Sequence, residues 1–293
     1  MNKIKTKGII LAGGKGTRLY PMTSVFSKQL QPIYDKPMIY YPLSTLMLAN
    51  IRDILIISTP QDLPSFEKLF GNGSQWGINL SYQEQIYPNG LPEAFILGEQ
   101  FIGNNQVCLI LGDNIFYGKL DFFRNAISTN QGGTIFAYRV DNPSDYGVVE
   151  IGYNDEVLSI EEKPKIPKSN YAIPGLYIFD SNVIEYSKDL RPSKRGELEI
   201  TDLHLKYLTI NKLQVIKIGR GVAWLDTGTP DNLLYASTFI QAVEKRQGLK
   251  ISCPEEIAYL MGFIDLEKYE RIVNLLPNSD YKNYCLKIMK ELS

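Results

Sequence analysis

The feature that most constrains this chain is a glycine-rich turn directly after its first apolar run. Residues 8–12 are typical of a short buried strand, and three of the four residues at 13–16 are glycine. Glycine allows positive φ and has no Cβ, so successive backbone N–H groups can point at a phosphate chain. Arg18 then offers a planar set of donors, and Lys28 a point charge. The segment predicts a strand-to-loop site for a polyphosphate.

The spacing of this turn differs from the two commoner phosphate loops. It lacks the G-x-G-x-x-G dinucleotide pattern, and no G-K-[ST] sequence closes the loop. This spacing disfavours a dinucleotide-dependent oxidoreductase. An ordinary tight turn is the alternative for the glycines alone, whereas the complete string GGKGTRL after an apolar strand is far more specific.

Composition narrows the class of protein. The 293 residues are 44% hydrophobic and 22% charged with a net charge of −1, so we expect neither a nucleic-acid partner nor an anionic membrane partner. No apolar run has membrane-spanning length, and the first residues do not resemble a secretory signal. Cys108, Cys253 and Cys285 are scattered without C-x-x-C spacing, which predicts a cytoplasmic protein and no zinc site.

The presence of a single histidine excludes sites that need more than one. His204 is the only one, so sites with several histidine ligands are impossible and a Ser-His-Asp triad would have to use it. It falls in residues 200–208, which read as an amphipathic helix. We therefore expect a histidine at the surface or at the core boundary.

Strand-like and helix-like segments alternate through the first two thirds of the chain. The predicted strands are residues 8–12, 54–58, 78–83, 107–111, 134–140 and 214–218, and the predicted helices are 41–50, 62–70, 92–101 and 121–129. Alternation with crossover helices predicts a three-layer α/β fold with a mostly parallel, Rossmann-like sheet. Closely spaced segments at 148–151, 157–160 and 172–179 predict an inserted antiparallel part.

The pattern becomes helical from Pro230 onward. We expect helices at residues 231–247, from Cys253, at 266–275 and at 281–292. This predicts an α/β core over residues 1–230, with a helical C-terminal region over 231–293 packed on it.

Two aspartates follow apolar strands beside glycine. Asp113 comes after residues 107–111, and Asp226 after residues 222–225. Ligands of open α/β sheets gather at the carboxyl ends of strands, and Mg²⁺ takes one or two carboxylates together with phosphate and water. A turn-capping role is the alternative for either aspartate alone. Together with the glycine turn, the pair predicts a Mg²⁺ site.

Two further segments carry groups suited to a nucleotide and a sugar phosphate. Lys163 ends a short strand before a proline and can reach a phosphate, while the neighbouring Glu162 can accept hydrogen bonds from hydroxyl groups. A solvated charged turn is the alternative. Gln85 carries both a donor and an acceptor, as reading a nucleobase edge requires.

These segments together resemble the bacterial sugar-1-phosphate nucleotidyltransferases. The strings that carry the resemblance are LAGGKGTRLYP (11–21), SKQLQPIYDKPMIYYPLSTLMLA (27–49), LGDNIFYG (111–118), YGVVE (146–150), EEKP (161–164), RGELEITD (195–202), AWLDTGT (223–229) and QGLKISCPEEIA (247–258). The similarity extends over essentially the whole chain. It implies the transfer of a nucleotidyl group from dTTP to α-D-glucose 1-phosphate, which gives dTDP-glucose and pyrophosphate. It also implies a nucleotide half over about residues 1–115 and a sugar-phosphate half over about 116–230.

The resemblance also implies roles for individual residues. The implied nucleotide site is Leu11, Gly13, Gly14, Gly16, Thr17, Arg18, Gln85, Gly90 and Asp113. The implied sugar-phosphate site is Asn114, Tyr146, Gly147, Glu162, Lys163, Ile173 and Trp224. Asp113 and Asp226 would hold Mg²⁺. Arg18, Lys28, Lys163 and Asp226 would be the catalytic residues, and the alternative for Trp224 is a plain core position.

The family further implies a place in metabolism and a regulatory site. The reaction is the first step toward dTDP-linked deoxysugars such as rhamnose, and members are homotetramers inhibited by dTDP-rhamnose at a second nucleotide site. We expect that site near Arg220, Gly221, Arg246 and Glu256, with simple interface packing as the alternative. Two rival functions stay open: a related enzyme using UTP or another sugar phosphate, and a non-catalytic nucleotide sensor.

Overall fold

The computed structural model describes residues 5–14 and 16–292, so Lys15 of the glycine-rich turn lies outside the described residues. The main sheet contains β1 (Thr6–Leu11), β4 (Asp53–Ser58), β5 (Asn79–Glu84), β6 (Gln106–Leu111), β8 (Gly133–Arg139), β9 (Gly147–Ile151), β10 (Val157–Glu162), β11 (Tyr171–Ala172), β12 (Leu176–Phe179) and β13 (Leu213–Lys217). Two short ribbons pair β2 (Pro32–Ile33) with β3 (Lys36–Pro37) and β7 (Asn114–Tyr117) with β14 (Ala223–Asp226).

The helices precede, connect and follow these strands. They are α1 (Tyr40–Leu48), α2 (Leu63–Phe70), α3 (Glu93–Leu97), α4 (Glu99–Ile102), α5 (Asp121–Thr129), α6 (Val183–Lys188), α7 (Ile200–Thr209), α8 (Pro230–Gln247), α9 (Pro254–Leu260), α10 (Leu266–Leu275) and α11 (Asp280–Leu292). Short 3₁₀ turns are η1 (Thr17–Leu19), η2 (Met22–Ser24), η3 (Lys28–Leu30), η4 (Ser74–Trp76) and η5 (Pro143–Asp145).

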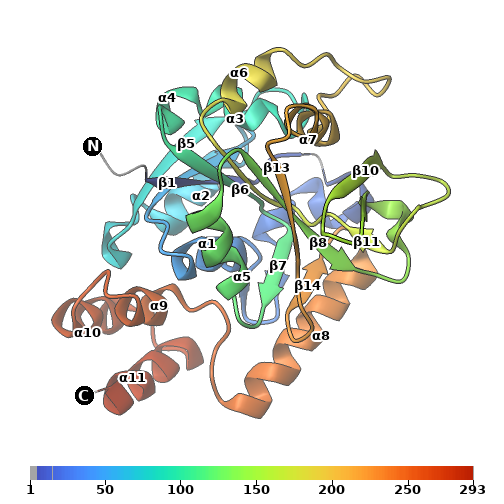
Figure 1. The fold of residues 1–293 in the computed structure, drawn as a ribbon. Coiled ribbons are helices and arrows are strands. Elements are labelled where there is room, and N and C mark those ends of the chain that lie inside the picture. The colour runs from blue at the N-terminus through green and yellow to red at the C-terminus, as the bar shows by residue number, and fades with distance from the viewer. Residues whose placement is uncertain (1–4, 15, 293) are drawn as a thin grey trace.

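The main sheet is mixed, in the order β10-β9-β11-β8-β12-β6-β1-β4-β5, with β13 paired to β8. The pairings from β6 to β5 and of β13 with β8 are parallel, and the others are antiparallel. Strands β5, β4, β1 and β6 run parallel, and β12 runs antiparallel between β6 and β8. Figure 1 shows β1 inside the sheet with helices on both sides of it. The three-layer α/β fold expected from the alternating pattern is confirmed.

Neighbouring residues of the central strands face opposite layers. Ile10 belongs to a buried cluster that includes residues of α1, α2, α5 and the C-terminal helices, whereas Ile9 belongs to one with residues of α3, α4, α6 and α7. Both side chains are fully buried. Such continuous apolar strands are typical of a sheet covered on both faces.

Two predicted segments differ from the structure. Residues 92–101 form two short helices, which are separated at Gly98. Residues 172–179 are divided at Pro174, which has no N–H group to donate. The first part, β11, pairs with β8 and β9, whereas β12 lies between β6 and β8.

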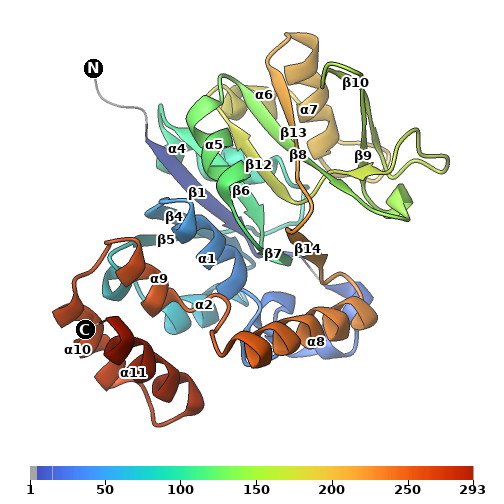
Figure 2. The ribbon, with the colours of Figure 1, turned by 60° about the horizontal axis from the view of Figure 1, so that its bottom comes forward.

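The C-terminal helices pack against the face that carries α1. In Figure 2, α9, α10 and α11 lie beside α1 and α2, away from β9 and β10.

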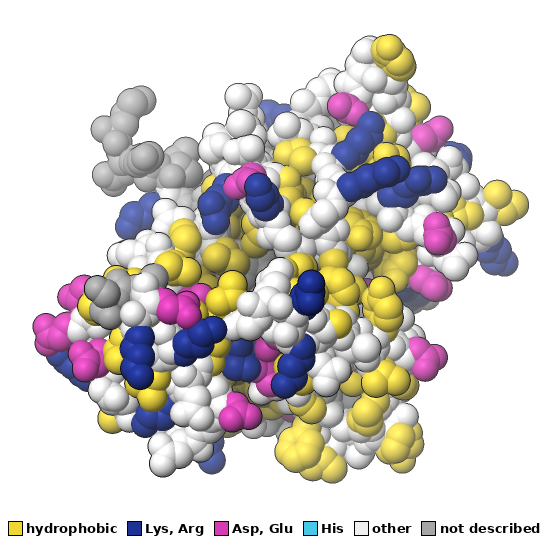
Figure 3. All heavy atoms as spheres, turned by 90° about the horizontal axis from the view of Figure 1, so that it is seen from below, with side chains coloured by type: hydrophobic (Ala, Val, Ile, Leu, Met, Phe, Trp, Pro, Cys, Tyr) yellow, Lys and Arg dark blue, Asp and Glu magenta, His cyan; other side chains and the backbone are white. Residues whose placement is uncertain are grey.

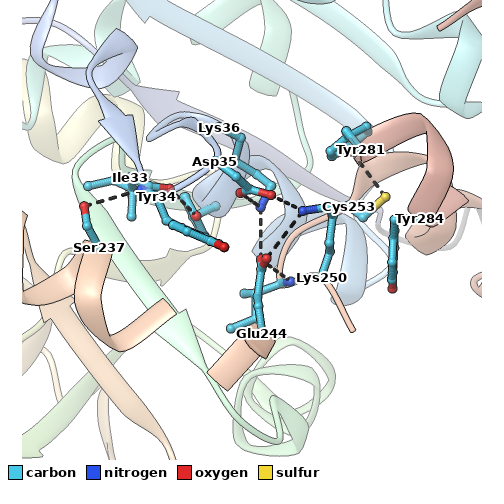
Figure 4. A network of polar contacts seen from close by, with 12 residues as sticks. Ile33, Tyr34, Asp35, Lys36, Ser237, Glu244, Lys250, Cys253, Tyr281 and Tyr284 are labelled. Atoms are coloured by element: carbon cyan, nitrogen blue, oxygen red, sulfur yellow. Dashed lines mark hydrogen bonds and ion pairs between the residues drawn. The ribbon is translucent and has the colours of Figure 1, made fainter. Parts of the chain in front are cut away.

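Figure 4 shows the polar network that joins α8 and the following loop to the β2–β3 hairpin. Glu244 Oε1 lies 3.2 Å from Lys36 Nζ, and Glu244 Oε2 lies 3.5 Å from Lys250 Nζ. Lys250 also forms an ion pair with Asp35. These buried ion pairs fix the end of α8 against the core.

Two cysteines that are distant in the sequence meet in this region. The Cys253 and Cys285 sulfur atoms lie 3.8 Å apart. Tyr281 donates to the Cys253 sulfur at 3.2 Å (Figure 4). All three cysteines of the chain are free and buried. The scattered spacing in the sequence therefore did not indicate how close two of them lie.

The position expected for His204 is wrong. The helix predicted around it forms as α7, but His204 is only 1% exposed. Its ring packs on those of Tyr177 and Phe179, with centroid distances of 5.2 and 6.0 Å. The amphipathic pattern did not indicate this burial, because it results from the packing of α7 on β8, β10, β13 and α6. No helix in the described part of the chain is long and apolar enough to span a membrane.

Candidate active site

Two adjoining clefts lie at the carboxyl ends of β1 and β6. The first, here the glycine-turn cleft, is lined by Leu11, Gly13, Gly14, Gln85, Gly90, Arg195 and others. The second, here the carboxylate cleft, is lined by Asp113, Asn114, Tyr146, Gly147, Ile173, Trp224, Asp226 and others. Arg18, Glu162 and Lys163 line both. A third hollow beside them is lined by Gly16, Thr17, Lys28 and others. The structure therefore gathers the predicted nucleotide, sugar-phosphate and metal residues at one edge of the sheet.

The glycine-rich turn needs its glycines for two separate reasons. Gly14 and Gly16 have φ of 101° and 56°, a region that residues with a Cβ rarely adopt. Gly13 lies against another side chain, because a Cβ there would come within 2.6 Å of Gln85 Oε1. A residue with a Cβ would therefore be strained at positions 14 and 16 and would clash with Gln85 at position 13.

Gln85 is held in one orientation. It is 5% exposed and follows β5, and its Nε2 donates to Glu93 Oε2 at 2.7 Å. Asn89 donates to the other oxygen of Glu93, also at 2.7 Å. Gly90 follows with φ of 111°, and a Cβ there would lie 2.0 Å from the Leu198 carbonyl oxygen. Glu93 is therefore a positioning residue for Gln85 that sequence reasoning did not identify.

Lys28 and Asp113 form a close ion pair in this site. Lys28 Nζ lies 2.5 Å from Asp113 Oδ2. Burial alone would raise the pKa of Asp113, but the ammonium group of Lys28 and the hydrogen bonds from Lys28 and Asn114 outweigh it and lower that pKa. Asp113 is therefore a carboxylate at neutral pH.

The two-stranded β14–β7 ribbon, and not the main sheet, positions Asp226 near Asp113. In the β14–β7 register Asp226 pairs with Asn114, the residue after Asp113. The Thr227 hydroxyl also donates to the Asp113 carbonyl oxygen at 2.9 Å. Burial and the nearby charge of Asp113 raise the pKa of Asp226 to about 6. A pair of carboxylates in this arrangement favours a shared cation or a retained proton.

Arg18 and Asp226 approach each other beside Gly228. A Cβ on Gly228 would lie 3.2 Å from Arg18 Nη2 and 2.9 Å from Asp226 Oδ2. Gly228 therefore leaves the space in which these two side chains approach each other. Arg18 comes from η1, directly after the glycine turn.

Asn114 is fixed by three hydrogen bonds. Its Oδ1 accepts from Trp224 Nε1 at 2.7 Å and from the Gly175 N–H at 3.0 Å, and its Nδ2 donates to Asp113 Oδ1 at 2.8 Å. Trp224 also packs edge-on to Tyr146 at 5.1 Å. The tryptophan thus orients a polar group of the cleft as well as filling space.

Glu162 and Lys163 stand at the end of β10. Thr201 donates to Glu162 Oε2 at 2.8 Å, and Arg195 Nη2 lies 3.8 Å from Oε1. Lys163 has φ of 44°, and its N–H donates to the Tyr146 carbonyl oxygen at 3.1 Å. This conformation is uncommon for a residue with a Cβ and is typical of constrained functional sites.

Backbone contacts place Gly147 and Ile173 opposite Glu162. The Ile173 N–H donates to the Gly147 carbonyl oxygen at 2.8 Å, and a Cβ on Gly147 would lie 3.4 Å from Glu162 Oε2. Thr201, Arg195, Tyr177 and His204 also line the clefts, although sequence reasoning gave them no role. They lie within or near the string RGELEITD or on β12, and only the packing of α7 on β12 brings them together.

The four residues expected at a regulatory site are not among those that line the two clefts. Gly221 follows Arg220 before β14, and its carbonyl oxygen would lie 2.5 Å from a Cβ on Gly118. Arg246 is next to Gln247 at the end of α8, and Gln247 Nε2 donates to the Tyr117 hydroxyl at 2.9 Å. These contacts place the end of α8 near the loop of Gly221. Glu256 instead accepts from Tyr284 at 2.6 Å, on α11.

The chain belongs to the nucleotidyl transferase family of enzymes, whose sequence profile matches residues 7–243. Its relatives include the glucose-1-phosphate thymidylyltransferase of Neisseria meningitidis serogroup A, which is 53% identical over 287 residues, or 97% of this chain and 100% of that protein. The enzyme of the same name from Mycobacterium tuberculosis strain H37Rv is 54% identical over 285 residues, with 97% and 99% covered.

Solved structures show the same fold. A crystal structure of a glucose-1-phosphate thymidylyltransferase from Bacillus anthracis in complex with sucrose has a TM-score of 0.75 and 39% identity, over 80% of this chain and 95% of that one. A UDP-glucose pyrophosphorylase in complex with UDP-glucose has a TM-score of 0.73 and 25% identity, over 83% and 100%.

Proposed function

We propose that this enzyme transfers a thymidylyl group from dTTP to α-D-glucose 1-phosphate and releases pyrophosphate. The observation that carries the proposal is that Asp113 and Asp226 line one cleft together with Arg18, and that Asp113 also lines the adjoining hollow of the glycine turn. The relatives that bear this activity in their names cover 97% of the chain at more than 50% identity.

The proposed mechanism needs no general base. The attacking group is a phosphate oxygen of the sugar phosphate, which is largely dianionic at neutral pH because a second phosphate pKa lies near ~6. The chain must bring two anions together, align them and neutralise the developing charge. Lys163 would hold the sugar phosphate, while Arg18 and Lys28 would stabilise the α-phosphate and the departing pyrophosphate. Asp113 and Asp226 would hold the metal ion.

The two aspartates fit a divalent cation. Carboxylate oxygens are the ligands that Mg²⁺ prefers, and a cation between them would relieve the repulsion that contributes to the raised pKa of Asp226. Asp113 and Asp226 would hold the ion, which when bound would supply Lewis-acid stabilisation of the negative charge that develops in phosphoryl transfer.

The remaining substrate contacts are proposed residue by residue. Leu11, Gly13, Gly14, Gly16, Thr17 and Arg18 would surround the triphosphate, Gln85 and Gly90 would contact thymine, and the deoxyribose would lie near Asp113. Asn114, Tyr146, Gly147, Glu162, Ile173 and Trp224 would contact glucose. Residues 1–115 would thus form the nucleotide half of the core and residues 116–230 the sugar-phosphate half.

A matrix of nucleoside triphosphates against sugar 1-phosphates tests the function. Pyrophosphate release with and without Mg²⁺ should be fastest for dTTP with glucose 1-phosphate and should require the metal. Thymine and uracil share a hydrogen-bonding edge, so Gln85 alone does not separate them. Higher kcat/KM for UTP, or for another sugar, would instead support the rival enzyme of this fold. No turnover with any pair would support a non-catalytic nucleotide sensor.

We also propose a cellular setting. The enzyme would act in the cytoplasm, where cysteine thiols stay reduced, and would supply dTDP-glucose to the synthesis of dTDP-rhamnose and related sugars of surface polysaccharides. The three free cysteines support this setting. A strain lacking the gene should lose dTDP-rhamnose from its nucleotide-sugar pool.

The C-terminal region, residues 231–293, is proposed to serve assembly and regulation. Leu234 and Tyr235 of α8 are 66% and 64% exposed, and Figure 3 shows apolar side chains gathered on the face viewed from below. Such patches are typical of interaction sites.

We propose a homotetramer inhibited by dTDP-rhamnose near Arg220, Gly221, Arg246 and Glu256. Light scattering measures the assembly, and Arg220→Ala should abolish inhibition without lowering basal turnover.

A further inference from the structure

His204 lines the carboxylate cleft, and among the described residues it has no polar partner. It lines the same cleft as Glu162, Lys163 and Asn114. It also lies one helical turn after Thr201, which hydrogen-bonds Glu162. Both ring nitrogens are buried, and among the described residues neither has a hydrogen-bond partner.

Packing alone does not account for a histidine at this position. The ring stacks on Phe179 with an interplanar angle of 22° and lies 5.2 Å from the centre of the Tyr177 ring. A phenylalanine would satisfy those contacts without burying two polar atoms. An unmatched buried polar group is costly, and in native proteins such a group usually has a water or ligand as its partner.

We propose that His204 forms a polar subsite of the carboxylate cleft, at which its imidazole binds one ordered water that hydrogen-bonds a hydroxyl group of the sugar. This inference rests on the proposed function, since it assumes that the sugar phosphate occupies this cleft. His204 is thereby a specificity-determining residue that acts on the sugar rather than on the nucleotide. Phosphate contacts remain with Lys163.

The electrostatic state of the ring suits this role. Burial lowers the pKa of His204 to about 3, so the imidazole is neutral at physiological pH and offers one donor and one acceptor. A neutral imidazole can hydrogen-bond a water molecule or a hydroxyl group, and it does not favour a negatively charged ligand over a neutral one. A buried water that makes two to four hydrogen bonds is a common structural element.

His204→Phe tests the subsite in the full-length enzyme, because it keeps an aromatic ring against Tyr177 and Phe179 and removes both nitrogens. Losing one net hydrogen bond should raise KM for glucose 1-phosphate about 3- to 10-fold. The kcat value and the KM for dTTP should stay unchanged. Ser187→Ala is the matched control, since Ser187 Oγ on α6 is also buried and unpartnered but lies outside the carboxylate cleft.

Glucose 1-phosphate analogues lacking one hydroxyl at a time identify the contact. For one analogue, wild type and His204→Phe should have the same KM, because the interacting group is missing from the substrate. An unchanged KM for glucose 1-phosphate in His204→Phe would overturn the subsite. A KM raised equally for every analogue would assign His204 a merely structural role, which also overturns it.

The single histidine allows a measurement that needs no variant. The imidazole ¹⁵N resonances of the wild-type enzyme report only His204. They should shift on addition of glucose 1-phosphate and not on addition of inorganic phosphate. Absence of a shift at saturating glucose 1-phosphate would contradict the subsite. Failure of wild type to make dTDP-glucose, in contrast, would contradict the proposed function.

Discussion

Lys28 Nζ lies 2.5 Å from Asp113 Oδ2, although 85 residues separate the two in the sequence. Lys28 is buried in η3, and Asp113 follows β6. The pair links the segment after the glycine turn to the strand that supplies the proposed metal ligand. Loss of either charge should therefore affect both stability and turnover.

Lys28→Met should lower kcat/KM by about 100-fold or more, because a preorganised cation at the reacting phosphate is removed. It should also destabilise the fold by about 2 kcal/mol or more, since Asp113 loses its partner while still largely buried. Steady-state kinetics and urea unfolding measure the two effects. The double variant Lys28→Met with Asp113→Asn should recover stability but not activity. A double variant as unstable as the sum of the single changes would contradict the ion pair.

Asp226→Asn should stabilise the enzyme at high pH when divalent cations are absent. The pKa of Asp226 is raised from 3.8 to about 6, so the native state binds the proton more tightly than the unfolded state does. Wild type therefore loses stability as pH rises from about 4 to about 6. A difference of roughly two pKa units corresponds to about 3 kcal/mol. The variant, which has no carboxyl at position 226, should gain that amount above pH 7 and nothing near pH 4.

Urea unfolding with EDTA at pH 4 and pH 8 measures this difference. Adding Mg²⁺ at pH 8 should then stabilise wild type and leave Asp226→Asn nearly unchanged, because the metal relieves the carboxylate repulsion only where both carboxylates are present. Equal stabilisation of both proteins by Mg²⁺ would argue against Asp226 as a ligand.

Gly228→Ala should lower kcat about 10- to 100-fold, because a displacement of about 1 Å at a catalytic group costs rates of this order. The added Cβ would push Arg18 and Asp226 apart. The change should shift Tm little, since the atoms it meets are side-chain ends. Gly219→Ala is the control: a Cβ there meets no described atom within 4 Å, and Gly219 is not among the positive-φ residues. Equal kinetics for the two variants would contradict this account of Arg18.

Glu93→Ala should raise KM for dTTP about 3- to 10-fold while KM for glucose 1-phosphate stays constant. Glu93 accepts from Gln85 Nε2 and so fixes which end of the amide faces the cleft, and one net hydrogen bond is worth this factor. Glu84→Ala, at an exposed position of β5, is the control. A rise in both KM values would indicate a general loss of structure instead.

The fold was predictable wherever a local pattern reports burial. Residues 8–12, 54–58 and 107–111 are short apolar runs between turn formers, and all three form central parallel strands. The position of β12 was not predictable, because its place between β6 and β8 depends on pairing between strands distant in the chain.

By itself, the sequence determined the α/β class, the glycine turn and the strand-end positions of Asp113 and Asp226, because these depend on local periodicity and on the chemistry of single residues. Only the tertiary structure decided the side-chain contacts of Lys28 with Asp113, Glu93 with Gln85 and Thr201 with Glu162. It also decided that His204 is buried. Those contacts join segments that are eight to 85 residues apart, some on different elements. They form when the buried faces of the sheet and helices fix how the elements pack.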